Sequence, residues 1–138
     1  MSGFKISELD HIVLNVSDIE RSLQFYTGVM GLKAERLDEF RTGKAGFPSV
    51  RINADTIIDL FPVRGQQSRQ NDGEKTAGNL NHFCMVIGKE DFAGIVDYLK
   101  ENSIIITEGP VSRWGARGRA TSVYFLDPDG NEIEIRCY

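Results

Sequence analysis

The sequence predicts an α+β protein made of two tandem βαβββ modules, whose strands form a cupped mixed or antiparallel sheet with helices on its outer face. The segments LDHIVLNV (9–16) and LNHFCMVI (80–87) carry this prediction, because each has Leu, then Asp or Asn, then His, then an apolar run. A stretch with helical spacing of apolar residues and three further strand-like stretches follow each segment. Neither half could bury both faces of a sheet alone, so we expect one domain over residues 1–138.

Module one is expected to span residues 8–62. Its β-branched apolar residues predict a strand over 8–16, and Ser17 and Glu20 fit a capping box that starts a helix ending near Met30. Three further strands are expected at 32–40, 47–53 and 56–62.

Module two is expected to span residues 80–138 and to repeat this order. An apolar stripe predicts a helix over 89–102. The motif DPDGN (127–131) predicts a tight turn before the last strand, because Pro presets φ and Gly accepts a positive φ. A polar, glycine-containing segment, 63–79, is expected to link the modules. The strands of module two are expected at 80–87, 104–108, 120–127 and 131–137.

Composition and charge argue against several classes of protein. With 138 residues, 41% of them hydrophobic, the chain resembles an ordinary globular protein. A net charge of −4 argues against a nucleic-acid binder, which needs a basic surface. No apolar run has membrane-spanning length, the N-terminus has no signal-peptide core, and Cys84 and Cys137 form no CxxC pair. We therefore expect a cytoplasmic protein without nucleic-acid or membrane partners.

The two histidines of the chain occupy the same place in the two modules. Because strand side chains alternate between faces, His11 and His82 point away from the helix-facing residues of their strands. The last strand of each module places a carboxylate, Asp59 or Glu134, on the corresponding face. Two imidazoles and two carboxylates suit a divalent transition metal and leave positions for water or substrate. Alternatively, each histidine has only a structural role in its strand, as lone strand histidines commonly do.

Three stretches together resemble the vicinal oxygen chelate superfamily: LDHIVLNVSDIERSLQFYTGVMGL, LNHFCMVI and SVYFLDPDGNEIEI. This superfamily contains glyoxalase I, extradiol dioxygenases, fosfomycin-modifying thiol transferases and metal-free bleomycin-binding proteins. The chain looks closest to its small glyoxalase-domain proteins. The metal ligands that the resemblance implies are His11, Asp59, His82 and Glu134. Glyoxalase I has Glu where this chain has Asp59, and without that residue a 2-His-1-carboxylate triad remains.

The reaction that the resemblance implies is the isomerisation of a hemithioacetal of a 2-oxoaldehyde and a thiol, as in methylglyoxal detoxification. A divalent metal (Ni, Zn, Co, Mn or Fe) would hold neighbouring substrate oxygens, while a carboxylate moves a proton between adjacent carbons. Glu134 is the first candidate for this catalytic role and Asp59 the second. Two alternatives stay open. One is another metal enzyme of the superfamily, a dioxygenase or a thiol transferase, and the other is a metal-free protein that binds a small molecule.

The segment 112–119 is the candidate for substrate binding. Arginine forks bind carboxylates in a bidentate way, so the segment would suit an anionic substrate such as a glutathione adduct. The alternative is a solvated hairpin loop. Open sheet edges in such modules also predict a homodimer. The predicted substrate-binding residues are Arg113, Trp114, Arg117 and Arg119.

Overall fold

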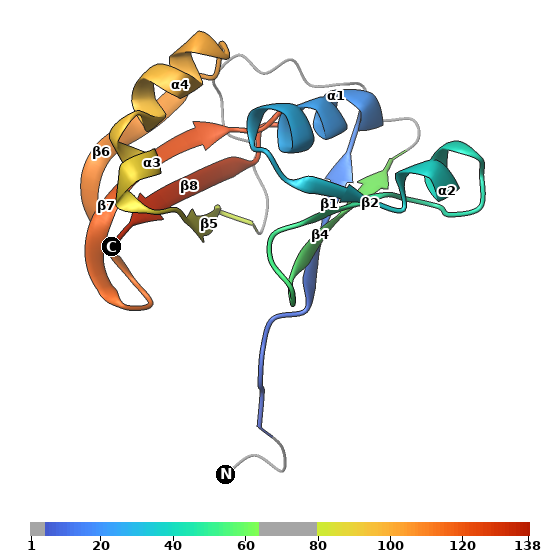
Figure 1. The fold of residues 1–138 in the computed structure, drawn as a ribbon, viewed down its shortest axis with the longest axis horizontal. Coiled ribbons are helices and arrows are strands. Elements are labelled where there is room, and N and C mark those ends of the chain that lie inside the picture. The colour runs from blue at the N-terminus through green and yellow to red at the C-terminus, as the bar shows by residue number, and fades with distance from the viewer. Residues whose placement is uncertain (1–4, 64–79) are drawn as a thin grey trace. The chain divides into compact units, whose positions relative to one another are not determined.

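The computed structural model describes residues 5–63 and 80–138, and the chain divides into two compact units, residues 1–67 and 68–138. Each unit has one four-stranded mixed sheet and helices of its own (Figure 1). The predicted α+β class and the two tandem βαβββ modules are therefore confirmed. The predicted linker, 63–79, lies outside the described residues apart from its first residue.

The sheet of the first unit has the strand order β1-β4-β3-β2. β1 (His11–Val16) is parallel to β4 (Ile57–Pro62). β3 (Ser49–Arg51) is antiparallel both to β4 and to β2 (Lys33–Glu35). A parallel pair is possible here because the helices and the two middle strands form the long connection between β1 and β4. The first and last strands of the module therefore lie side by side.

The first predicted helix begins as α1 (Ile19–Leu23) and continues as the π-helical η1 (Gln24–Val29). Its N-cap is Asp18, whose carboxylate accepts a hydrogen bond from the backbone N–H of Arg21 at 3.2 Å. The capping residue is therefore one position later than the predicted Ser17. Asp18 takes this place because it has the extended backbone of a cap, with φ −136° and ψ 104°.

The strand predicted over 32–40 is partly wrong. It is a strand only in β2, after which the chain forms the short helix α2 (Leu37–Arg41). Arg36, between the two elements, has a left-handed backbone with φ 57° and ψ 27°, which ends the strand. The Arg41 guanidinium then donates to Glu20 at 3.0 Å and joins α2 to α1.

The sheet of the second unit repeats the topology, with the order β5-β8-β7-β6. β5 (Phe83–Val86) is parallel to β8 (Glu132–Cys137). β7 (Gly118–Leu126) is antiparallel both to β8 and to β6 (Ile106–Gly115). β6 is longer than the predicted 104–108, because it continues beside β7 up to the hairpin turn.

The second predicted helix is divided into α3 (Lys89–Ala93) and α4 (Ile95–Glu101). The break is at Gly94, whose φ of −103° and ψ of 5° depart from helical values. Glycine gives the backbone this freedom and weakens a helix interior, which the apolar stripe of the sequence does not reveal. No helix in the described parts of the chain combines the length and apolarity needed to cross a membrane.

Each sheet buries one face against its own helices (Figure 1). In the first sheet this face includes Leu14, Val16, Ile58 and Leu60, all at most 4% exposed, as strand alternation predicts. The second sheet has Val123, Phe125, Ile133 and Ile135 in the same role. Full burial of one such side chain contributes about 1.5–3 kcal/mol. The predicted metal ligands lie on the opposite faces of these sheets.

Candidate functional site

The first unit brings His11 and Asp59 together on neighbouring strands. His11 begins β1, and Asp59 lies in the middle of β4, two residues beyond the register partner of His11. The His11 Nε2 and the Asp59 Oδ2 are 3.9 Å apart. Asp59 is 7% exposed, so its carboxylate needs polar partners inside the protein.

The second unit brings His82 and Glu134 together in the same way. His82 lies directly before β5, and Glu134 lies on β8 opposite Cys84. The His82 Nε2 and the Glu134 Oε2 are 3.1 Å apart, and Glu134 is 3% exposed. The Glu134 side chain is one methylene longer than that of Asp59, which agrees with the shorter distance to its imidazole.

The residue before each histidine orients the imidazole. The Nδ1 of His11 lies 2.6 Å from the Asp10 carboxylate, and the Nδ1 of His82 lies 2.7 Å from the Asn81 side-chain oxygen. Both oxygens are acceptors, so Nδ1 carries the hydrogen and Nε2 is turned toward the carboxylate of the module. The hydrogen bond to Asp10 is also the main reason why the pKa of His11 is raised above its ordinary value, with the Asp59 charge adding to it.

In each carboxylate, the oxygen that does not face the imidazole accepts a hydrogen bond from a buried serine. The Ser49 hydroxyl donates to the Asp59 Oδ1 at 2.6 Å. The Ser122 hydroxyl donates to the Glu134 Oε1 at 2.6 Å. Both serines are at most 1% exposed. One oxygen of each carboxylate is thus engaged by a hydroxyl, while the other faces an imidazole.

The arrangement in the second unit fits a cation. Once Nδ1 of His82 donates to Asn81, the neutral ring presents a lone pair at Nε2 to a carboxylate oxygen 3.1 Å away. Two acceptors at this distance repel each other unless a proton or a positive ion lies with them. Imidazole nitrogen with carboxylate oxygen is a donor set that divalent transition metals accept, and metal-bound histidines commonly donate their other nitrogen as His82 does.

Each unit by itself supplies one imidazole and one carboxylate. Among residues 5–63 and 80–138, no three His, Cys, Asp or Glu side chains are gathered into a metal-binding group. The role of the four residues as ligands of one metal therefore stays a prediction.

Arg136 is a buried cation beside Glu134. It is 3% exposed, and its NH1 and NH2 groups donate to the backbone carbonyls of Trp114 and Arg113 at 3.0 and 2.5 Å. NH1 lies 3.9 Å from the Glu134 Oε1, while Nε has no hydrogen-bond partner within the described residues. A Cβ on Gly115 would lie 1.8 Å from NH1, so only glycine leaves room for the guanidinium.

Two further groups on this face stay protonated at neutral pH. Burial and the charge of Glu134 raise the pKa of Tyr124 to about 12, and the Tyr124 ring packs edge-on against His82 with centroids 5.4 Å apart. The same two causes raise the pKa of the Cys84 thiol to about 12, although the residue keeps contact with solvent. Cys84 is therefore a poor nucleophile at neutral pH, since only the thiolate attacks.

The predicted substrate-binding residues lie in the β6–β7 hairpin, which presents them on two faces. Arg113 is opposite Ala120 in the β6–β7 register. Its side chain is therefore on the same sheet face as Ser122 and the candidate ligand Glu134. Trp114 is opposite Arg119, and that pair projects from the other face of the sheet. These residues do not gather into one cluster within the unit, because neighbouring strand positions alternate.

The contacts of the hairpin residues also differ. Arg113 forms an ion pair with Glu108. Arg117, at the turn, stacks over the Tyr138 ring at 4.2 Å, and its backbone N–H donates to the Tyr138 hydroxyl at 3.0 Å. Trp114 is 77% exposed. The solvated hairpin that the sequence left as an alternative describes Trp114 well.

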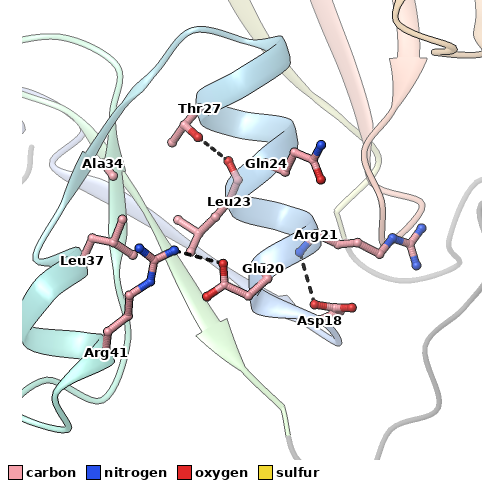
Figure 2. A pocket seen from close by; sticks show the side chains of 9 residues that line it. All are labelled: Asp18, Glu20, Arg21, Leu23, Gln24, Thr27, Ala34, Leu37 and Arg41. Carbon is pink, nitrogen blue, oxygen red and sulfur yellow. Dashed lines mark hydrogen bonds and ion pairs between the residues drawn. The ribbon is translucent and has the colours of Figure 1, made fainter.

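A separate hollow of about 530 Å³ lies on the helix side of the first unit, between α1, β2 and α2 (Figure 2). Three of its charged side chains already have partners, since Arg41 reaches Glu20 and the Asp18 carboxylate caps α1. It lies across the sheet from His11 and Asp59, so it is distinct from the site described above.

Comparison with known proteins assigns the class of this protein. The model of the Glyoxalase/Bleomycin resistance protein/Dioxygenase superfamily matches residues 8–135, so the chain belongs to this superfamily, as the sequence resemblance implies. Virulence protein STM3117 of Salmonella typhimurium is 33% identical over 133 residues, which cover 96% of this chain and 85% of that protein. Metallothiol transferase FosB of Staphylococcus epidermidis is 29% identical over 131 residues, covering 95% and 82%. The crystal structure of a glyoxalase/dioxygenase from Nostoc punctiforme is 31% identical with a TM-score of 0.79, covering 99% of this chain and 94% of that one.

Sequence reasoning missed the residues that support the candidate ligands. The sequence pattern could have identified Asp10 and Asn81, because an Asp or Asn precedes each histidine in the two similar segments. No sequence pattern marks Ser49 and Ser122, since serine is common in strands and the partner of each lies on another strand. The burial of Arg136 could not be foreseen either, because it depends on the carbonyls of a hairpin about 22 residues away.

Proposed function

We propose that this protein is a metal-dependent enzyme and that its two imidazole–carboxylate pairs are its ligands for a divalent cation. The observation that carries the proposal is the imidazole–carboxylate pair, in which Nε2 of His82 and Oε2 of Glu134 lie 3.1 Å apart and Nδ1 of the imidazole contacts the Asn81 side-chain oxygen. His11 and Asp59 supply the corresponding pair of the first module. The candidate ions are Ni, Zn, Co, Mn and Fe, which accept mixed nitrogen and oxygen ligands.

The reaction we propose first is glyoxalase I-like isomerisation of a hemithioacetal made from a 2-oxoaldehyde such as methylglyoxal and a thiol. A bound divalent cation supplies a Lewis acid for the neighbouring oxygens of such a substrate. Glu134 would remove the proton from the carbon that carries sulfur and return it to the adjacent carbon, while the hydroxyl proton of the first carbon moves to the oxygen of the second, which gives a 2-hydroxyacyl thioester. Asp59 is the second candidate for this proton transfer. The Ser122 hydroxyl holds Oε1 of Glu134, so Oε2 would be the atom that accepts the proton, and it would have to leave the cation while it carries that proton.

Substrate recognition is proposed for the hairpin arginines. Arg113 is the first candidate, because it shares a sheet face with Glu134 and a guanidinium suits an anionic group such as a glutathione carboxylate. Roles for Trp114, Arg117 and Arg119 stay predictions. A homodimer is also proposed, in which sheet edges of the modules are covered by a second copy.

A second candidate reaction is thiol transfer. It is favoured by the similarity to metallothiol transferase FosB over most of both chains. Both candidates need a thiol and a divalent cation, but they differ in the second substrate, which is a 2-oxoaldehyde in one and an electrophile such as an epoxide in the other.

The test begins with elemental analysis of the purified protein, followed by chelation and return of Ni, Co, Zn, Mn or Fe(II), the last without oxygen. Isomerase activity is then measured with methylglyoxal and glutathione, and thiol transfer with fosfomycin and the same thiol. We expect activity that follows metal content and disappears in His82→Ala. A matched control is Arg21→Gln, a substitution on α1 at the helix side of the first sheet. A protein that binds none of these metals would overturn the proposal and leave a metal-free binding protein.

A further inference from the structure

The serines beside the two carboxylates occur in both units but not at equivalent places. Ser49 lies directly opposite Asp59 in the β3–β4 register. Glu134 is opposite Tyr124 instead, and its serine, Ser122, is two positions away along β7. A repeated pattern inherited position by position would place the two serines alike.

The difference follows from side-chain length. The short Asp59 side chain reaches a hydroxyl on the directly opposite residue, at 2.6 Å. The longer Glu134 side chain reaches a hydroxyl one pleat further along the neighbouring strand, also at 2.6 Å. The two units therefore have the same arrangement although their serines stand at different register positions. In each carboxylate, one oxygen accepts from a buried hydroxyl and the other faces an imidazole.

We propose that Ser49 and Ser122 are positioning residues, which make Asp59 and Glu134 each bind a cation through one oxygen, Oδ2 and Oε2 respectively. This inference rests on the proposed metal-dependent function. A hydroxyl that donates to a carboxylate forms a short, charge-assisted hydrogen bond and stops rotation of the group. The carboxylate therefore has its binding orientation before the cation arrives. Metal binding then does not carry the entropy cost of fixing the side chain.

The hydroxyl can be tested without changing the shape of the side chain. In the whole chain, Ser49 and Ser122 are both replaced by Thr, which keeps the hydroxyl, or both by Val. Valine has the shape of threonine but lacks the hydroxyl, so the two pairs differ only in that group. β-branched residues suit these strand positions. An alanine pair removes the hydroxyl without adding volume and decides the question if threonine does not fit. The matched control is Ser22→Ala, an equally buried serine in α1.

The readouts are the affinity of the chelated protein for Co²⁺ and the visible absorption of the cobalt form. We expect the valine and alanine pairs to bind Co²⁺ roughly 10- to 100-fold more weakly than the natural protein, the range typical for loss of an outer-shell hydrogen bond. The cobalt spectrum should change as well, because a released carboxylate alters the coordination. The threonine pair and Ser22→Ala should bind as the natural protein does.

The outcomes separate the two proposals. If the natural protein does not bind Co²⁺, the proposed function fails. If it binds and the valine and alanine pairs bind equally well with an unchanged spectrum, the positioning role is wrong while the metal site stands. If the threonine pair binds as weakly as the valine pair, the alanine pair decides, and natural Co²⁺ affinity in that pair would overturn the positioning role. An equal loss in Ser22→Ala would overturn it too, because the loss would then reflect packing.

Discussion

Gly115→Ala tests whether the Arg136 guanidinium is held as the structure describes. The added Cβ would lie 1.8 Å from NH1 and 2.5 Å from the guanidinium carbon, so the group must leave its place. It then loses hydrogen bonds to the Trp114 and Arg113 carbonyls. Hydrogen bonds that involve a charged group contribute about 1.5–3 kcal/mol each. The free energy of unfolding should therefore fall by about 3 kcal/mol or more.

A double-mutant cycle isolates this effect. In an Arg136→Ala background the guanidinium is absent, and the nearest remaining atom to the added Cβ is the movable Tyr138 hydroxyl, at 2.7 Å. Gly115→Ala should then cost less than about 1 kcal/mol, so the two substitutions should couple by about 2 kcal/mol. Urea unfolding followed by circular dichroism measures all four proteins. Gly46→Ala, where no atom lies within 4 Å of the added Cβ, is the control and should have little effect.

Two results would refute this reasoning. One is a loss below about 1 kcal/mol for Gly115→Ala in the natural background, since a displaced buried charge costs more than that. The other is an equal loss in both backgrounds, which would mean that the clash involves other atoms than those of Arg136.

Three further predictions concern the ligands, a thiol and a helix. Glu134→Gln should weaken Co²⁺ binding by about 100-fold and Asp59→Asn by about 10-fold, because Oε2 of Glu134 lies nearer its imidazole; the reverse order in titrations would contradict this. Cys84 should react with Ellman's reagent near pH 8 at least 100-fold more slowly in the folded protein than in urea, because its pKa is raised to about 12; equal rates would refute this. Gly94→Ala should raise the free energy of unfolding by about 0.5–1 kcal/mol, since the added Cβ meets no atom within 4 Å; a loss of stability would show that the break between α3 and α4 is needed.

Much of the fold could be predicted because alternation along a strand is local. The apolar residues of β1 and β4 face the helices, and His11 and Asp59 face the other way, as their positions in the sequence require. The strand predicted through Arg36 failed, because one residue with a left-handed backbone ends β2 there. Such a conformation at a non-glycine residue is held by its surroundings and has no signature in a polarity pattern.

The candidate site divides in the same way. The repeated Leu-Asp/Asn-His pattern pointed to both histidines, and the residue before each is the one that orients it. Ser49 and Ser122 became visible only as partners of carboxylates on neighbouring strands. The hairpin arginines were grouped by closeness in the chain, although adjacent strand residues point to opposite faces.

By itself the sequence determined the duplicated βαβββ order, the face of each strand that turns toward its helices, and the imidazole and carboxylate that each module offers. These depend on residue type and on spacings of a few residues, which the covalent chain sets. Only the tertiary structure decided which hydroxyl holds each carboxylate and why Arg136 is buried. Those contacts join strands that are separate in the chain, so their partners are selected by strand register and side-chain length.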